Sequence, residues 1–397
     1  MNQTCADLAE AAVRGLCAAG DLGDLADQAV ADVRLMGESW GHRSPDAPPA
    51  WSTLTADSTP LELSVVLGER PLGLRASVEA QAEPGSPGSY WDSALKLSER
   101  LSAVHGLDLS RLRRIEHLVA PRPADRPPMA AFHTLGWVPG RRPEGKIHLW
   151  LAGGSRSATA ARTDAVLTAL GFPGQWQVVA DAMDDDDTVS YLCLDLAAGP
   201  LARTKLYVQH RGSLTPDKLA RWDRLGPSAE LDDGPTMARI AARAWERSAW
   251  QGEVPSRTRL EWRSNHRRFW SYGTYVSFLP GRARPIESVM HQFGLTPRSR
   301  SDAEAQWMVR EVLDAYDVSP ESRAAYERCA RFFMSGDAGD EMYAHSFLSA
   351  QRSVDGPARV AVYFNPRMFF RRHGLSNGDL ALAERFHGGN GAGSGTC

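Results

Sequence analysis

Apolar and polar residues alternate along several short stretches of this chain, which is the period of a β-strand with one buried face. These stretches come in pairs joined by turns rich in glycine and proline, a pattern that predicts β-hairpins. The five predicted pairs of strands are 61–67 with 72–79, 130–138 with 146–151, 188–196 with 201–209, 258–263 with 271–279, and 341–349 with 358–364.

Helical periodicity fills the segments between the hairpins. Start signals support several of these helices: Thr215-Pro216 and Ser319-Pro320 each place a capping residue before a proline, and Ser301-Asp-Ala-Glu304 forms a capping box. The predicted helices are 3–19, 21–36, 90–105, 108–117, 157–171, 216–224, 235–248, 302–316, 320–333 and 376–386.

Hairpins that alternate with helices, at intervals of roughly 60–85 residues, indicate an internal repeat. Consecutive hairpin strands are antiparallel, so the pattern predicts an α+β protein rather than a parallel sheet. Ten antiparallel strands remove their edges by closing into a barrel, with helices outside and a lumen for small molecules. An open sheet, or two of them, is the alternative.

Composition excludes several classes of protein. The net charge is −3, which favours neither a nucleic acid nor a membrane as partner, so any anion binding must be local. Five cysteines are scattered without metal-site spacing, and no apolar run reaches the ~20 residues of a membrane span. Without a recognisable signal peptide, we expect a cytoplasmic protein with one domain over 1–387 and a disordered Gly-rich tail over 388–397.

The segment Arg203–Tyr207 is the most informative stretch of the chain. Because side chains alternate across a strand, Arg203, Lys205 and Tyr207 share one face, opposite an apolar one. Two cations beside a phenol suit an anion site with an aromatic rim, whereas a solvated face of the sheet is the alternative. Similar basic or aromatic strands recur elsewhere in the chain.

Glu62 stands on an otherwise apolar strand, Leu61–Leu67. A carboxylate is costly there unless it is paired or faces a wet lumen. An edge position facing solvent is the alternative.

Four motifs along the chain resemble motifs of the aromatic prenyltransferases of the dimethylallyltryptophan synthase family. They are Thr59–Ser64 with Leu74–Glu79, Lys146-Ile-His148, Arg203-Thr-Lys-Leu-Tyr207 and Val362-Tyr-Phe364. The resemblance implies the ABBA (PT-barrel) fold, in which five ααββ repeats close ten antiparallel strands around a reaction chamber. The chain departs from the family at His148, which replaces a tyrosine, and at Arg359, where the family often has an aromatic residue.

The resemblance also implies roles for individual residues. Glu62 would accept the indole N–H. Four cations would bind the diphosphate of dimethylallyl diphosphate: Arg75, Lys146, Arg203 and Lys205. Four rings would shield the allylic cation: His148, Tyr207, Tyr275 and Tyr363. Because the cations neutralise the leaving group and aromatic faces stabilise an allylic cation, no metal cofactor is expected.

Two further features have competing interpretations. His133, thirteen residues before Lys146, is a candidate base for the proton lost on re-aromatisation, or else a satisfied core histidine. Asp184–Asp187 superficially resembles the magnesium motif of isoprenoid synthases, but it lies in a loop before a strand, so we expect a solvated acidic turn.

The expected reaction is transfer of a dimethylallyl group to the indole ring of tryptophan or a tryptophan-derived compound. Relatives that use free tryptophan have an arginine where this chain has Ser190 or Tyr191, so Arg263, Arg359 or a backbone amide would take its place. Two alternatives stay open: the same fold acting on a phenolic or tyrosine acceptor, and a non-catalytic barrel that binds a small anionic ligand.

Overall fold

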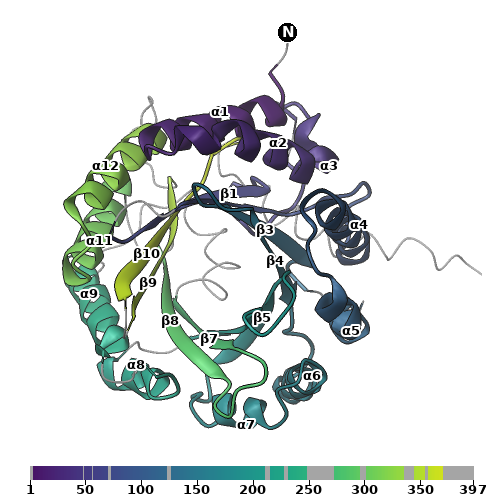
Figure 1. The fold of residues 1–397 in the computed structure, drawn as a ribbon, viewed down its shortest axis with the longest axis vertical. Helices are drawn as coiled ribbons and strands as arrows, with labels where there is room; N and C mark the ends of the chain where they lie inside the picture. The colour runs from purple at the N-terminus through teal and green to yellow at the C-terminus, as the bar shows by residue number, and fades with distance from the viewer. Residues whose placement is uncertain are drawn as a thin grey trace, which may run out of the picture.

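The computed structural model of the chain describes residues 3–369 apart from 48, 56, 70–72, 123–126, 211–214, 228–230, 248–271, 296–300, 335–343 and 354–355. Ten antiparallel strands form a closed barrel, as predicted, and Figure 1 shows the chain passing once around it. The strands are β1 (Leu61–Leu67), β2 (Gly73–Val78), β3 (Ala131–Trp137), β4 (Glu144–Trp150), β5 (Thr188–Asp195), β6 (Thr204–Gln209), β7 (Tyr272–Phe278), β8 (Ile286–Gly294), β9 (His345–Ser353) and β10 (Gly356–Phe364).

Each strand pairs with its neighbours in sequence, and the first strand pairs with the last. The closing seam joins β1 to β10, with Leu63 opposite Phe364 and Leu67 opposite Val360. Closure leaves no unpaired edge, which excludes the open-sheet alternative.

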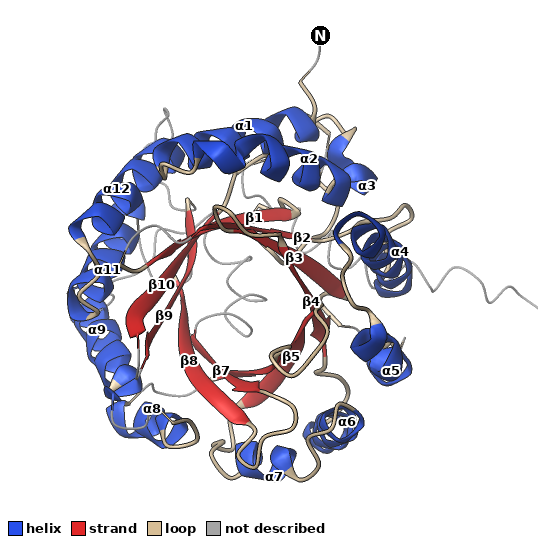
Figure 2. Cartoon of the chain, viewed as in Figure 1, coloured by secondary structure: helices blue, strands red, loops and turns tan. Residues whose placement is uncertain are grey.

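Helices surround the barrel on its outer side (Figure 2). They precede each hairpin in the ααββ order that the resemblance implied. Their bounds are α1 (Cys5–Ala19), η1 (Gly23–Leu25), α2 (Ala26–Met36), α3 (Glu38–Gly41), α4 (Pro87–His105), α5 (Ser110–Val119), α6 (Arg156–Ala169), α7 (Gln175–Ala180), α8 (Pro216–Asp223), α9 (Asp233–Arg247), α11 (Asp302–Ala315) and α12 (Pro320–Met334).

The hydrophobic core fills the layer between barrel and helices. On β1, Leu61, Leu63 and Val65 belong to this core, whereas the intervening Glu62 lines a cavity inside the barrel. The alternation seen in the sequence therefore sorts each strand into an apolar outer face and a more polar inner face.

The prediction for the fourth hairpin is wrong in its pairing. β7 is paired with β6 on one side and with β8 on the other, so the predicted strand 258–263 is not its hairpin partner. Segment 258–263 lies outside the described residues, as do the predicted helix 376–386 and the tail 388–397. Strand β8 was missed because its pattern is irregular: the outer face carries the polar His291, which bonds Asp223 of α8, and the inner face carries the apolar Met290.

Buried hydrogen bonds tie the helices to the barrel. A chain of side chains runs from Asp187 to His210 (3.0 Å), then to Thr274 (2.8 Å), His291 (2.9 Å) and Asp223 (2.8 Å). It links the segment before β5 to the end of β6, to β7, β8 and α8. A similar anchor holds β3, where Asp32 of α2 accepts a 2.8 Å hydrogen bond from the Trp137 indole.

Among the described residues, no helix combines the length and the apolar character that crossing a membrane requires.

Candidate active site

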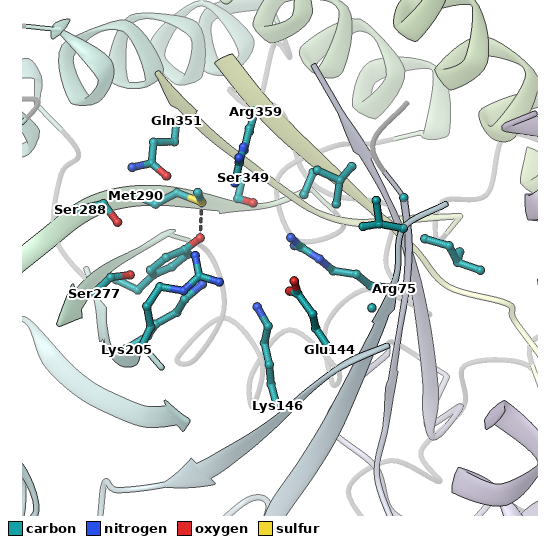
Figure 3. Close-up of a pocket in the computed structure, with 18 of the residues that line it drawn as sticks. Arg75, Glu144, Lys146, Lys205, Ser277, Ser288, Met290, Ser349, Gln351 and Arg359 are labelled. Atoms are coloured by element: carbon teal, nitrogen blue, oxygen red, sulfur yellow. Dashed lines mark hydrogen bonds between the residues drawn. The ribbon is translucent and has the colours of Figure 1, made fainter. Parts of the chain in front are cut away.

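The four basic residues predicted to bind a diphosphate converge inside the barrel. Arg75 lies on β2, Lys146 on β4 and Lys205 on β6, while Arg203 directly precedes β6. All four line one cavity of about 270 Å³. Figure 3 shows Arg75, Lys146 and Lys205 pointing into the same space. Arg359 of β10 and Arg141, from the turn between β3 and β4, line this cavity too, so six cations surround it.

A carboxylate that the sequence analysis did not single out lies among these cations. Asp195 of β5 accepts a 2.8 Å hydrogen bond from Arg203 Nε, and its Oδ1 lies 3.4 Å from Lys146 Nζ. Although burial opposes ionisation, Lys146 and Arg203 hold the pKa of Asp195 well below its usual range. Asp195 is therefore an ionised group that orients two cations of the site. The alternation of β5 could have found it, because Asp195 has the same phase as the inward-facing Tyr191.

Burial and mutual repulsion make this cluster favourable for an anion. Burial, together with nearby Lys205, lowers the pKa of Lys146 to about 8. Burial, together with Arg203, lowers the pKa of Lys205 to about 8 as well. An anion bound between them would offset both effects, because it stabilises the protonated amines. The site therefore has more positive charge than its two carboxylates, Glu144 and Asp195, compensate.

An aromatic wall continues from the cation cluster deeper into the lumen. Lys205 Nζ lies 4.6 Å from the centre of the Tyr275 ring. Tyr207 is next to Tyr275, with ring centres 4.8 Å apart, and Tyr191 stacks on Tyr207 at 4.1 Å. His148 completes the row at 6.0 Å from Tyr207. Three of the four predicted shielding rings are thus contiguous.

The fourth ring, Tyr363 of β10, lines the inner cavity together with Glu62 and Gln292. This inner cavity, of about 60 Å³, shares Arg75, Lys146, Lys205 and Tyr275 with the outer one. The two cavities are therefore parts of a single chamber.

Glu62 lies in the inner part of this chamber and is 6% exposed. Its Oε1 accepts a 2.6 Å hydrogen bond from Ser346 Oγ. Burial raises the pKa of Glu62 to about 8, an effect that the Ser346 hydrogen bond only partly offsets. The edge alternative for Glu62 is excluded, because β1 is paired on both sides and its carboxyl group faces the lumen. A buried carboxyl group with one partner can accept a further hydrogen bond from a ligand.

His133 does not face the chamber, which corrects its assignment as the base. Its Nε2 lies 2.7 Å from Ser98 Oγ of α4, in the layer outside the barrel. Burial lowers the pKa of His133 to about 3. The residue opposite Lys146 on β3 is Thr134, which lines the chamber. His133, the neighbouring residue, therefore lies on the opposite, outer face of the strand. His133 is thus a core histidine, whose Nε2 is bonded to Ser98 and whose Nδ1 has no hydrogen-bond partner among the described residues.

Thr134 is one of the chamber residues that the sequence analysis missed. Its hydroxyl lies 2.8 Å from that of Ser77 on β2. The strand alternation could have indicated both residues, because Ser77 shares the phase of Arg75.

Ser190 and Tyr191 occupy the place where relatives that use free tryptophan have an arginine. Tyr191 faces the chamber, whereas the Ser190 hydroxyl donates a 3.2 Å hydrogen bond to the Tyr207 carbonyl. Arg263 lies outside the described residues.

The acidic run lies in the loop between α7 and β5, as expected, but it is not simply solvated. Lys218 Nζ lies 2.9 Å from Asp184 and 2.7 Å from Asp187, and Asp187 is buried. A lysine ammonium in contact with the carboxylates does not fit a magnesium site, because two cations would compete for the same oxygens. The run also lines a different cavity from that of the diphosphate-site candidates.

Comparison with solved structures identifies the fold. The chain is similar to PriB in binary complex with product diphosphate, with 21% identity and a TM-score of 0.74 over 92% of this chain and 97% of that chain. It is similar to 5-dimethylallyl tryptophan synthase from Streptomyces coelicolor in complex with DMASPP and Trp, with 20% identity and a TM-score of 0.76 over 93% and 97% of the two chains. It is also similar to 6-dimethylallyltryptophan synthase from Micromonospora olivasterospora in complex with DMASPP and Trp, with 19% identity and a TM-score of 0.75 over 92% of this chain and 98% of that chain.

These comparisons confirm that the protein has the PT-barrel fold of the dimethylallyltryptophan synthases. No protein-family model matches the sequence, and no curated protein matches it either. At about one identical residue in five, the likeness defines the fold, while the function has to be argued from the site.

Proposed function

We propose that this protein is a prenyltransferase that moves a dimethylallyl group from dimethylallyl diphosphate to the indole ring of tryptophan or a tryptophan-derived compound. One observation carries the proposal. A cluster of cations, a buried carboxyl group, Glu62, and a row of aromatic rings line a single chamber. The solved structures with the same fold include proteins in complex with diphosphate, with DMASPP and with Trp.

The cations would bind the diphosphate and promote its departure. A guanidinium group such as that of Arg75 or Arg203 contacts two phosphate oxygens at once, whereas Lys146 and Lys205 act as point charges. When the carbon–oxygen bond of the donor breaks, the electron pair leaves with the diphosphate, and the cations stabilise the charge that develops there. The allylic cation left behind would lie against Tyr207 and neighbouring rings, which exclude water. Each such contact contributes about 1–2 kcal/mol when desolvated.

Glu62 would hold the acceptor. Its carboxyl group would accept the indole N–H and so place the ring with one face toward the allylic cation. Burial raises the pKa of Glu62 to about 8, so its carboxyl group is largely protonated at pH 7 in the empty chamber. As a ring carbon attacks, positive charge spreads onto the indole nitrogen; this charge favours the carboxylate form of Glu62, which in turn stabilises it. A phenol could donate its O–H to the same carboxyl group, so the panel of acceptors described below decides between the indole and the phenolic alternative.

We propose that the transfer needs no metal ion. The charge on the diphosphate would be neutralised by side chains, among them Arg203 and Lys205, that already lie in the chamber. The acidic cluster that could hold a cation, Asp184 with Asp186 and Asp187, is instead paired with Lys218.

We also propose a cytoplasmic location. Cys17, Cys193 and Cys329 are buried thiols, which fits a compartment in which cysteines stay reduced.

The test of the function is a direct assay of transfer. The protein would be incubated with dimethylallyl diphosphate, EDTA and a panel of acceptors: tryptophan, tryptophan-containing cyclic dipeptides, and tyrosine. Mass spectrometry should find an indole acceptor in which one dimethylallyl group has replaced a hydrogen. Diphosphate binding without transfer to any acceptor would favour the non-catalytic barrel.

Two substitutions test the assigned roles. We expect Glu62→Gln and Lys205→Ala each to lower kcat/KM by about 10²-fold or more, because each removes a charged contact that acts in the transition state. Only Lys205→Ala should weaken the binding of inorganic diphosphate in calorimetry. Lys96→Ala, on the exposed face of α4, is the matched control and should leave both quantities unchanged. Near-normal kinetics in either variant would remove that residue from the site.

A further inference from the structure

His148 differs from the other buried histidines of the described structure. Its Nδ1 is buried without a hydrogen-bond partner among the described residues, as is that of His133, but among the buried histidines that the structure describes only His148 lines the chamber. Each of the others has at least one side-chain partner: Ser98 for His133, Asp187 and Thr274 for His210, Thr274 and Asp223 for His291, and Asp302 and Tyr326 for His345. A buried imidazole that no protein group engages has its hydrogen-bonding capacity left for a ligand.

The position of His148 is fixed by packing. Its ring stacks on Phe132 at 4.1 Å with only 7° between the planes. Tyr191 meets it edge-on at 5.8 Å. His148 lies two residues beyond Lys146 on β4, and it lines the same inner cavity as Glu62. The ring is thus held between the cation cluster and the residue proposed to anchor the indole.

The environment keeps this ring neutral. Burial, together with Lys146 and Lys205, lowers the pKa of His148 well below its usual value. A neutral imidazole has a lone pair on one ring nitrogen, which a shielding residue would not need.

Transfer to an indole carbon requires a proton acceptor, because the intermediate keeps its ring hydrogen until aromaticity is restored. Other residues are poorly suited to accept it. The carboxylates Glu144 and Asp195 are absent from the lining of the inner cavity, and Asp195 is already held by Arg203 and Lys146. Arg75 has no lone pair, and Lys146 and Lys205 must stay protonated to hold the diphosphate. Burial raises the pKa values of Tyr191 and Tyr207 well above their usual range, so both phenols keep their protons. Glu62 is engaged with the indole N–H.

We propose that His148 is the base that completes the reaction, in addition to lining the cation site; this inference rests on the proposed function. After the allylic cation has bonded to a ring carbon, the C–H bond at that carbon breaks. Its electron pair restores the aromatic ring, and the proton moves to a nitrogen of His148. The resulting imidazolium lies near Lys146 and Lys205, whose repulsion favours passing the proton on to the diphosphate that leaves the chamber.

A weak base is sufficient for this step. A protonated aromatic ring is a strong acid, so the acceptor needs a free lone pair more than a high proton affinity. A ring that stays neutral beside two ammonium groups meets that need.

His148→Phe separates the two roles, because phenylalanine keeps the aromatic face and loses the nitrogen. His148→Gln is a second variant that keeps a polar group but cannot accept the proton at neutral pH. We expect product formation to fall about 10²-fold or more in both variants. With an acceptor deuterated at the reacting carbon, both should also show a primary isotope effect on turnover that is larger than that of the unaltered protein, because proton loss becomes rate-limiting.

The control is His133→Gln, which alters the outward-facing histidine on β3. It should keep both the turnover and the isotope effect of the unaltered protein. Thermal unfolding and calorimetry with inorganic diphosphate show whether each variant keeps its fold and its anion site.

A folded His148→Phe variant with turnover within about threefold of normal and an unchanged isotope effect would overturn the inference and leave His148 as a shielding ring only. Should His148→Phe not fold, the same outcome with His148→Gln would overturn it. Failure of the unaltered protein to prenylate any indole is a different result, because it refutes the proposed function itself.

Discussion

At the scale of single residues, the most unexpected group is a carboxylate inside a site built for an anion. Asp195 keeps Arg203 and Lys146 oriented, yet it repels whatever anion those cations bind. Asp195 therefore limits the affinity of the site, and such a limit favours release of the product diphosphate.

Replacing this carboxylate should separate binding from turnover. We expect Asp195→Asn to tighten the binding of inorganic diphosphate by about tenfold, because it removes one like charge from the site. Turnover should fall if product release becomes slower. Calorimetry and steady-state kinetics measure the two effects. Weaker binding in this variant would show that the orientation of Lys146 and Arg203 matters more than the repulsion.

The lysines of the site predict how diphosphate binding depends on pH. Burial lowers the pKa values of Lys146 and Lys205 to about 8. Both amines are charged below that pH and lose their protons as the pH rises through it. The affinity for inorganic diphosphate should therefore be constant between pH 7 and about 7.5 and decrease above pH 8.

Lys205→Arg tests this explanation, because a guanidinium group stays protonated throughout this range. The decrease in affinity should become shallower in the variant. An affinity that does not change between pH 7 and 9.5 in the unaltered protein would contradict the prediction.

At the scale of secondary-structure elements, buried side-chain hydrogen bonds lock the barrel to its helices. Thr274 of β7 has one hydroxyl group between two imidazole rings, His210 and His291, each of which is also bonded to a carboxylate. Valine at this position keeps the shape and removes both contacts.

We expect Thr274→Val to lower the free energy of unfolding by about 2–4 kcal/mol, because two buried ring nitrogens lose their partner. The control is Thr163→Val on α6, where the lost hydroxyl bonds only the carbonyl of Thr159 in its own helix. That change should cost less than about 1 kcal/mol. Urea unfolding measures both values, and equal losses in the two variants would show that the bridge adds no stability.

The same scale shows what strand alternation can and cannot predict. It correctly placed Lys205 and Tyr207 on one face, because β6 has a regular apolar outer face, whereas Arg75 and Lys146 were indicated by the resemblance. The prediction for His133 was wrong because it relied on the thirteen-residue interval to Lys146. The alternation of β3 would have placed His133 on the outer face. Alternation was also weak in β8, and there the strand itself was missed.

At the scale of the whole molecule, the fold was predictable and the pairing of charges was not. Repeated hairpins and helices are local patterns, and an antiparallel arrangement with no free edge leaves few alternatives to a barrel. Which cation meets which carboxylate depends on contacts across strands. The pairing of Arg203 with Asp195 could be found only once the register of β5 and β6 was known.

The barrel as a whole should work without a divalent metal. We expect turnover in EDTA to stay within about twofold of turnover without chelator, because side chains supply the charge that magnesium provides elsewhere. Dialysis against chelator before the assay checks this. Loss of activity that Mg²⁺ restores would contradict the metal-independent mechanism.

The pairing of β1 with β10 also has a consequence for how the protein is made. While the ribosome is still extending the chain, β1 has been synthesised but its partner on the closing side has not, so one of its edges stays open to other chains. The nascent protein can assemble hairpins one after another, but it has no enclosed interior until the strand ending at Phe364 has emerged and docked. Contacts between such distant segments form slowly. Newly made molecules would therefore pass through a period in which aggregation competes with folding, and general chaperones that cover exposed strand edges should raise the yield of folded protein.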